Sequence, residues 1–183
     1  MRGPLLQGAL GSPATLDRVC RLVRGHEPVV VLSALWLAEA LASEMAVLAL
    51  VEEEKRRAAA RALRRARKHG LPLAIVVAAS EVPLGRASVG AILVDNLVDI
   101  EEEAAAHELL VGLLPVLRPG GLVLSLDATK NPALEARASK SFLAASLVCI
   151  TQIRPREGAL LTLANTPHPA VSAARALAFP SDP

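Results

Sequence analysis

Short apolar runs alternate along the chain with longer segments in which apolar residues recur every three or four positions. The runs predict strands, because short stretches without polar alternation are typical of strands that are buried on both faces. The predicted strands are Val29–Leu32, Ala46–Val51, Leu73–Val77, Ala91–Val94 and Leu122–Leu126. Strands of this kind occur mainly in parallel sheets covered by helices. The pattern therefore predicts an α/β protein.

The segments between these strands predict helices. Ser12 and Pro13 suit the cap and the first position of a helix, and Gly25 ends that helix. The other predicted helices are Ala34–Met45, Lys55–His69, Asp99–Leu117 and Asn131–Ala145. Residues 118–121 (Arg-Pro-Gly-Gly) predict a turn before the fifth strand. Two further runs, Leu147–Ile153 and Ala159–Ala164, predict a terminal antiparallel pair.

This order of elements predicts a doubly wound α/β sheet with helices on both faces. Ligands of such sheets bind beyond the carboxyl ends of the strands. The polar residues predicted at those ends are Ser33, Glu52, Glu81, Asp95 and Asp127. We expect one domain over residues 13–165, a loose lead-in over residues 1–12 and a tail rich in Pro and Ala over residues 166–183.

Composition excludes several classes of protein. Hydrophobic residues make up 52% of the chain, which excludes general disorder. A net charge of +2 and an aromatic share of 2% do not indicate a nucleic-acid partner. Cys20 and Cys149 lie far apart, so we expect a reducing compartment and no disulfide framework. The longest apolar stretch has ten residues, whereas a membrane span needs about 20. We therefore expect a cytoplasmic protein without a membrane segment.

Several stretches carry a family resemblance. They are Leu117–Leu122 (LRPGGL), Ser33–Ala38 (SALWLA), Glu52 at the end of the second strand, and the terminal segment 147–164. Over roughly residues 14–164 the chain resembles the class I S-adenosylmethionine-dependent methyltransferases, especially the small O-methyltransferases. The resemblance implies a Rossmann-like sheet of seven strands with the last pair antiparallel. It also implies that Glu52 stands where the family holds the cofactor's ribose, and that Asp95 aligns with a metal-binding acid of the O-methyltransferases.

The chain departs from that family where the cofactor binds. The family's first strand runs into a glycine-rich loop, because the backbone there must approach the cofactor closely. Here no glycine lies between Gly25 and Gly70. After the third strand the family's acid is missing, and Glu81 is the nearest replacement. Before the fourth strand, the family's common aspartate is replaced by Gly90.

Two functional hypotheses follow. The leading hypothesis is a methyltransferase-like protein that has lost S-adenosylmethionine binding and acts as a non-catalytic binding, scaffold or regulatory module, through a protein partner or as a homodimer. In the alternative, the chain is an active S-adenosylmethionine-dependent methyltransferase of the O-methyltransferase type. Ser33, Glu52 and Glu81 would then line the cofactor cleft, and Asp95 would orient an acceptor or a metal.

Each candidate residue has a simpler interpretation. Glu52 could belong to a solvated cluster with Glu53 and Glu54, and Asp95 could be a turn residue. Trp36 could pack on a cofactor or fill the core or an emptied cleft. Asp95 and Asp127 have no third ligand, and none of the four histidines shows ligand spacing, so we predict no metal site.

A strongly basic segment at residues 55–68 needs a separate interpretation. Arg57, Arg61, Arg64 and Lys68 share one face of the predicted helix. They could bind an acidic partner or phosphates. We favour a solvated outer face, with the alanines of the opposite stripe turned to the sheet.

Overall fold

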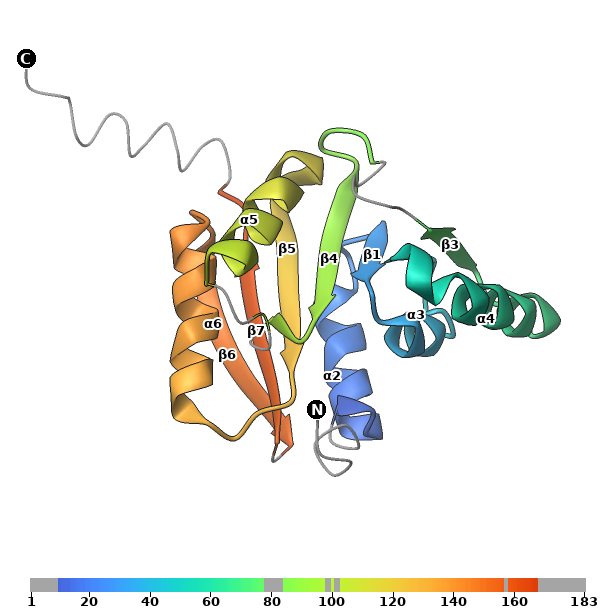
Figure 1. The fold of residues 1–183 in the computed structure, drawn as a ribbon, viewed down its shortest axis with the longest axis horizontal. Coiled ribbons are helices and arrows are strands. Elements are labelled where there is room, and N and C mark those ends of the chain that lie inside the picture. The colour runs from blue at the N-terminus through green and yellow to red at the C-terminus, as the bar shows by residue number, and fades with distance from the viewer. Residues whose placement is uncertain (1–9, 78–83, 98–99, 101–102, 157, 168–183) are drawn as a thin grey trace, which may run out of the picture.

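The computed structural model describes residues 10–77, 84–97, 100, 103–156 and 158–167. Its centre is a seven-stranded sheet in the order β3-β2-β1-β4-β5-β7-β6 (Figure 1). The strands are β1 (Val29–Leu32), β2 (Val47–Val51), β3 (Leu73–Val77), β4 (Val89–Asp95), β5 (Leu117–Asp127), β6 (Val148–Arg156) and β7 (Ala159–Asn165). The first five strands run parallel, and β7 is antiparallel to both β5 and β6. The predicted α/β sheet with an antiparallel terminal pair is confirmed.

Helices cover both faces of the sheet. The helices on one face are α2 (Pro13–Val23), α3 (Leu35–Leu41) and α4 (Arg56–Lys68). On the other face, α5 (Glu103–Leu113) and α6 (Pro132–Ala144) lie over the half of the sheet that holds β5, β6 and β7 (Figure 1). Ser12 caps α2 and Asn131 caps α6, each accepting a hydrogen bond from a backbone N–H of the first turn.

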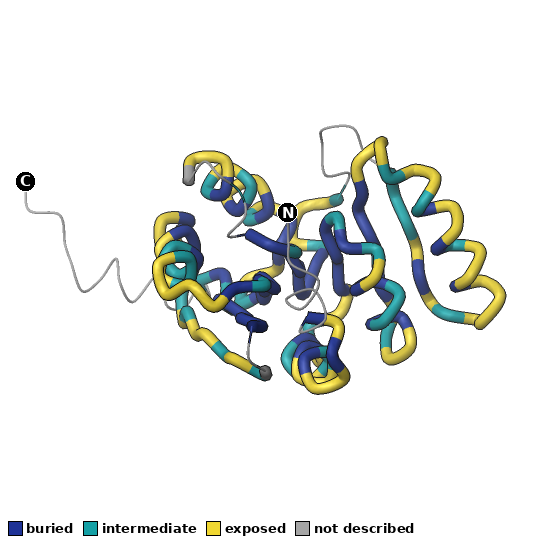
Figure 2. Tube along the Cα trace, turned by 60° about the horizontal axis from the view of Figure 1, so that its bottom comes forward, coloured by how far each residue is buried: buried dark blue, intermediate teal, exposed yellow. Residues whose placement is uncertain are grey.

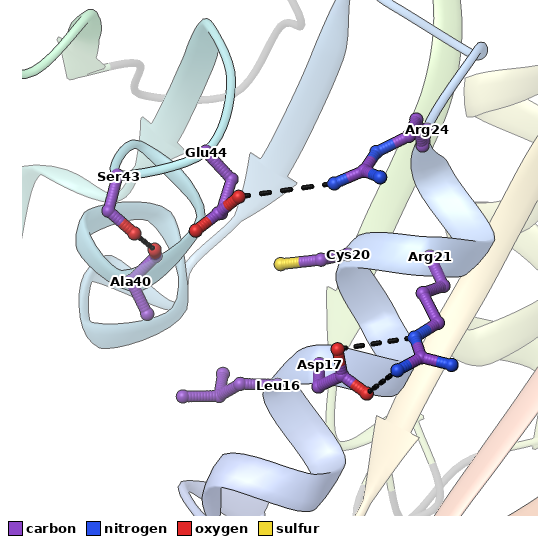
Figure 3. Close-up of a pocket in the computed structure, with 8 residues that line it drawn as sticks. All are labelled: Leu16, Asp17, Cys20, Arg21, Arg24, Ala40, Ser43 and Glu44. Carbon is purple, nitrogen blue, oxygen red and sulfur yellow. Dashed lines mark hydrogen bonds and ion pairs between the residues drawn. The ribbon is translucent and has the colours of Figure 1, made fainter.

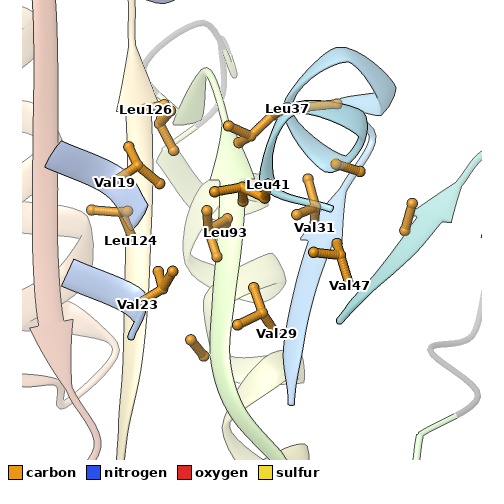
Figure 4. Close-up of a cluster of buried hydrophobic side chains, with 14 of the residues drawn as sticks. Val19, Val23, Val29, Val31, Leu37, Leu41, Val47, Leu93, Leu124 and Leu126 are labelled. Carbon is orange, nitrogen blue, oxygen red and sulfur yellow. The ribbon is translucent and has the colours of Figure 1, made fainter. Parts of the chain in front are cut away.

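The core has two layers because successive strand residues point to opposite faces. Val29 and Val31 pack with Leu37 and Leu41 of α3 on one side (Figure 4). On the other side, Val30 belongs to a second buried cluster that includes Phe142 and other residues of α5 and α6. Because both faces are covered, the strands are apolar throughout, as the sequence pattern predicts.

The prediction of a turn at residues 118–121 is wrong, because these residues lie within β5. Val89 pairs with Leu117, and Ala91 pairs with Leu122, so the segment stands opposite Gly90 alone. The end of β7 holds the segment in the sheet: Thr166 N donates to the Gly121 carbonyl at 2.9 Å. The sequence Pro-Gly-Gly by itself predicts a turn. Hydrogen bonds to the distant residues at the end of β7 keep the segment in the strand instead.

Two helices end several residues earlier than predicted. α3 ends at Leu41 instead of Met45, and the Ser43 hydroxyl donates to the Ala40 carbonyl at 2.7 Å, which competes with the helical backbone bonds. α5 ends at Leu113 and is followed by a 3-10 helix, η3 (Leu114–Val116), whose Pro115 lacks a backbone N–H. The predicted cap of this helix, Asp99, lies outside the described residues.

Candidate functional site

The connection between β1 and α3 is short. Only Ser33 and Ala34 separate the two elements. Ser33 has a φ of 61°, in the left-handed region that favours glycine. Its backbone N–H donates to the carbonyl of Leu50 in the neighbouring strand at 2.8 Å. The chain therefore turns from strand to helix directly at the carboxyl edge of the sheet, without a glycine.

Three polar side chains meet at this turn, and we call them the Ser33–Glu52–Lys55 cluster. The Ser33 hydroxyl donates a hydrogen bond to Glu52 Oε1. Lys55 Nζ lies 3.0 Å from Glu52 Oε2 and donates to the Ser33 carbonyl, also at 3.0 Å. A short 3-10 helix, η1 (Glu53–Lys55), turns the chain back after β2 and brings Lys55 over the strand ends. Both carboxylate oxygens of Glu52 therefore have partners from the chain itself.

The electrostatics of the cluster favour an ionised Glu52. Partial burial acts to raise the pKa of Glu52, but hydrogen bonds from Ser33, the backbone and Lys55, with the Lys55 charge, lower the pKa below its ordinary value. A carboxylate with a lowered pKa is a weak base, so it does little to activate the Ser33 hydroxyl as a nucleophile. The arrangement holds the strand ends together instead.

Asp95 and Asp127 end the neighbouring strands β4 and β5, but they are out of register. Asp95 pairs with Leu126, so the side chain of Asp127 points to the opposite face of the sheet. Asp127 is fully buried and accepts a hydrogen bond from the Ser125 hydroxyl at 2.7 Å. No group of three or more potential metal ligands occurs among the described residues. Asn96 follows Asp95 with a φ of 65°, which is typical of the turn interpretation.

Gly90, predicted to precede the fourth strand, lies within β4 and against the backbone of the segment before β1. A Cβ at this position would lie 2.0 Å from the His26 carbonyl oxygen. The Gly90 N–H donates to the Pro28 carbonyl at 3.0 Å. No side chain fits at Gly90 in this arrangement, because the two backbones pack closely against each other.

The predicted basic face is exposed on the outer side of α4. Arg57, Arg61, Arg64 and Lys68 are all exposed, whereas Ala59, Ala62 and Ala66 are buried against the sheet. Trp36, at the start of α3, is 37% exposed. The interpretation of Trp36 as a buried core filler is therefore wrong, because Leu37, Ala38 and Leu41 form the buried side of this helix.

A groove of about 520 Å³ lies between α2 and α3 (Figure 3). Its charged side chains pair within and across the groove: Arg21 with Asp17 at 2.9 Å, and Arg24 with Glu44 at 3.9 Å. Cys20 lies between them, and its pKa is raised by burial and by the charges of Glu44 and Asp17. The lining charges largely neutralise one another.

The comparisons with known proteins find similarity in structure and not in sequence. No protein-family model and no curated protein matches the chain. The fold is similar to a candidate O-methyltransferase from Nostoc punctiforme (TM-score 0.69, 18% identity), where the match covers 88% of this chain and 58% of the other. It is similar to a methyltransferase from Aquifex aeolicus that depends on S-adenosylmethionine (TM-score 0.59, 16% identity, 90% and 99% covered). It is also similar to the [4+2]-cyclase SpnF (TM-score 0.65, 13% identity, 83% and 81% covered).

The chain has the fold of the class I S-adenosylmethionine-dependent methyltransferases. The resemblance read from the sequence is thereby confirmed at the level of fold. The chain spans little more than half of the Nostoc protein, so this likeness carries no activity over to it. Ligands of doubly wound sheets bind beyond the carboxyl ends of the strands, which makes the Ser33–Glu52–Lys55 cluster, at the ends of β1 and β2, the candidate site.

Of the predicted cofactor residues, the structure brings Ser33 and Glu52 into contact. The predicted catalytic residue, Asp95, lies two strands from Glu52 at the same edge. Glu81 lies outside the described residues. Sequence reasoning missed Lys55, which it assigned only to the basic helix. The signal available was its position three residues after Glu52, the spacing of an ion pair within one helical turn.

Proposed function

We propose that this methyltransferase-fold protein has lost S-adenosylmethionine binding and acts as a non-catalytic binding module through protein contacts. The observation that carries the proposal is the engagement of both Glu52 oxygens by Ser33 and Lys55. A ribose diol would have to displace the Lys55 ammonium and the Ser33 hydroxyl to reach this carboxylate. Because the pair is half exposed, displacing each of these contacts costs about 0.2–1 kcal/mol, which counts against the roughly 8 kcal/mol of micromolar binding.

The short β1–α3 connection supports the same proposal. A glycine-rich loop offers backbone N–H groups to a ligand at close range. Here Ser33 and Ala34 are the whole connection, and their N–H groups donate to the carbonyls of Leu50 and Leu32. These residues therefore do not fit the cofactor, and we assign no chemical step to it. The [4+2]-cyclase among the similar structures illustrates that this fold is not tied to methyl transfer.

Isothermal titration of the full chain with S-adenosylmethionine and S-adenosylhomocysteine tests the proposal. We expect no binding tighter than about 1 mM, and no thermal shift with either ligand. A ligand at 100 times its Kd would stabilise the fold by about 2.7 kcal/mol, which is a shift of several degrees. An active methyltransferase of the same fold serves as the positive control.

The variant Lys55→Ala distinguishes the two observations that support the proposal, which are the occupied Glu52 carboxylate and the short β1–α3 connection. Removing the ammonium frees one oxygen of Glu52 but leaves the two-residue connection intact, so we expect the variant to remain without measurable binding. Low-micromolar binding by the wild type would overturn the proposal. It would favour the alternative of an active methyltransferase, with Asp95 as the residue to test next.

Among the described residues, no helix combines the length and the apolar character that a membrane span requires.

A further inference from the structure

The outer face of α4 carries an unusual excess of unpaired positive charge. Among the basic residues of this segment, Lys55, Arg56 and Arg65 pair with Glu52, Glu53 and Glu39. Five exposed cations have no ion-pair partner within the described part of the chain: Arg57, Arg61, Arg64, Arg67 and Lys68. Like charges three and four positions apart on a helix repel each other. The described residues therefore do not neutralise this face.

The cations form a straight row. Arg57, Arg61, Arg64 and Lys68 follow one another at steps of four, three and four residues, which places them on one side of α4 along about 16 Å of its axis. In Figure 2 the side of α4 that faces away from the sheet is exposed along the helix. A second α-helix packed along α4 would have the same residue spacing. If it carried carboxylates at steps of four, three and four residues, each carboxylate could pair with one of these cations.

Trp36 extends this surface. Two hydrogen bonds, at 3.0 and 2.9 Å, join Arg65 of α4 to Glu39 of α3. Both helices run back from the carboxyl edge of parallel strands, so they point in the same direction. Trp36 lies one turn before Glu39, and Arg61 lies one turn before Arg65. The exposed indole therefore lies toward the same end of the α3–α4 pair as Arg61, and Trp, Tyr and Arg are the residues most enriched in interface hot spots.

We infer that the outer face of α4, with Trp36, is the docking surface for an acidic helical segment of a partner protein. Charge complementarity carries the inference, since arginine forks pair well with carboxylates. A single-stranded nucleic acid fits less well, because Trp36 is the only exposed aromatic among the described residues, which leaves no second platform for stacking bases. The inference rests on the proposed function in one respect: the acidic helix would belong to the protein partner that the proposed binding module requires.

A peptide titration tests the inference. The probe is a fluorescein-labelled helical peptide of about 20 residues, with glutamates at i, i+4, i+7 and i+11 and a leucine flanking the row. The control peptide has the same composition, with its glutamates spread around the helix. By fluorescence anisotropy at low salt, we expect the matched peptide to bind at least about tenfold more tightly than the control peptide, with affinity falling as salt rises.

Variants matched in net charge test whether the peptide binds at the outer face of α4. The double charge reversal Arg61→Glu/Arg64→Glu should weaken peptide binding by about tenfold or more, and Trp36→Ala by about threefold or more. Arg18 and Arg86 are exposed outside α4, so Arg18→Glu/Arg86→Glu makes the same change in net charge and should leave binding within about twofold. Circular dichroism and thermal melts verify that each variant is folded.

Three outcomes would overturn the inference. They are equal binding of the two peptides, equal effects of the two double reversals, and tighter binding of a single-stranded RNA of equal charge than of the matched peptide. The peptide titration does not involve the Ser33–Glu52–Lys55 cluster. A negative peptide result would therefore not bear on the proposed loss of cofactor binding, which the S-adenosylmethionine titration tests. Conversely, binding of S-adenosylmethionine would not by itself contradict the docking surface on α4.

Discussion

The Ser33 hydroxyl donates a hydrogen bond to the Glu52 carboxylate across the ends of the adjacent strands β1 and β2. Ser33 makes this contact with its backbone at a φ of 61°. A side chain at such an angle costs about 1–2 kcal/mol, whereas glycine adopts the angle freely. The strain and the hydrogen bond therefore act in opposite directions at one residue, and substitutions can separate them.

Ser33→Gly should be more stable than Ser33→Ala by about 1 kcal/mol, because both variants lose the hydroxyl but only glycine relieves the backbone strain. Urea denaturation of the two variants measures the difference directly. Equal stability of the two variants, or a more stable alanine variant, would contradict the left-handed turn at Ser33.

Glu52→Gln should change how stability depends on pH. The pKa of Glu52 is lowered in the folded protein, so ionised Glu52 stabilises the fold above the ordinary pKa of about 4.5, and this contribution is lost as the pH falls through the lower folded value. The wild type should therefore exceed Glu52→Gln in stability at pH 7, by about 0.5 kcal/mol because the pair is half exposed. The difference should shrink below about pH 4.5. Thermal melts from pH 3 to pH 7 measure it, and a difference that grew in acid would be inconsistent with the cluster.

Gly90→Ala should destabilise the fold by about 3 kcal/mol or prevent folding, because its Cβ would lie 2.0 Å from a backbone oxygen that cannot move aside. Gly112→Ala is the matched control. Gly112 lies in α5, and an added Cβ would meet nothing within 4 Å, so this variant should gain up to about 1 kcal/mol from helix propensity. Chemical denaturation compares the two, and a well-tolerated alanine at position 90 would contradict the close approach of β4 to His26.

The two thiols should differ in reactivity. Cys149 is exposed on β6, whereas Cys20 is half buried with a raised pKa, so less of it is thiolate at neutral pH. Alkylation at pH 7.5 should therefore modify Cys149 first and Cys20 at least about tenfold more slowly. Mass spectrometry of Cys20→Ser and Cys149→Ser assigns each rate. Faster modification of Cys20 than of Cys149 would be the contrary result.

Much of the fold could be predicted from local patterns. The runs at residues 29–32 and 73–77 became β1 and β3 with unchanged bounds, because an uninterrupted apolar run leaves few alternatives to a strand buried on both faces. The parallel arrangement and the antiparallel ending followed from the order of elements and the short connection before Ala159. The stretch at residues 118–121 could not be predicted, since its place within β5 depends on hydrogen bonds to the distant Thr166 and Asn165.

The sequence alone determined the strand and helix order, the apolar faces and the absence of glycine after β1, because these properties depend on residues that are near neighbours in the chain. Only the tertiary structure decided which polar groups meet. It turned Lys55 back onto Glu52 and Ser33, placed Asp95 and Asp127 on opposite faces of the sheet, and left Trp36 exposed. Those outcomes depend on strand register and on the short path from β1 to α3. A shift of one residue in register would reverse which side chains face each other.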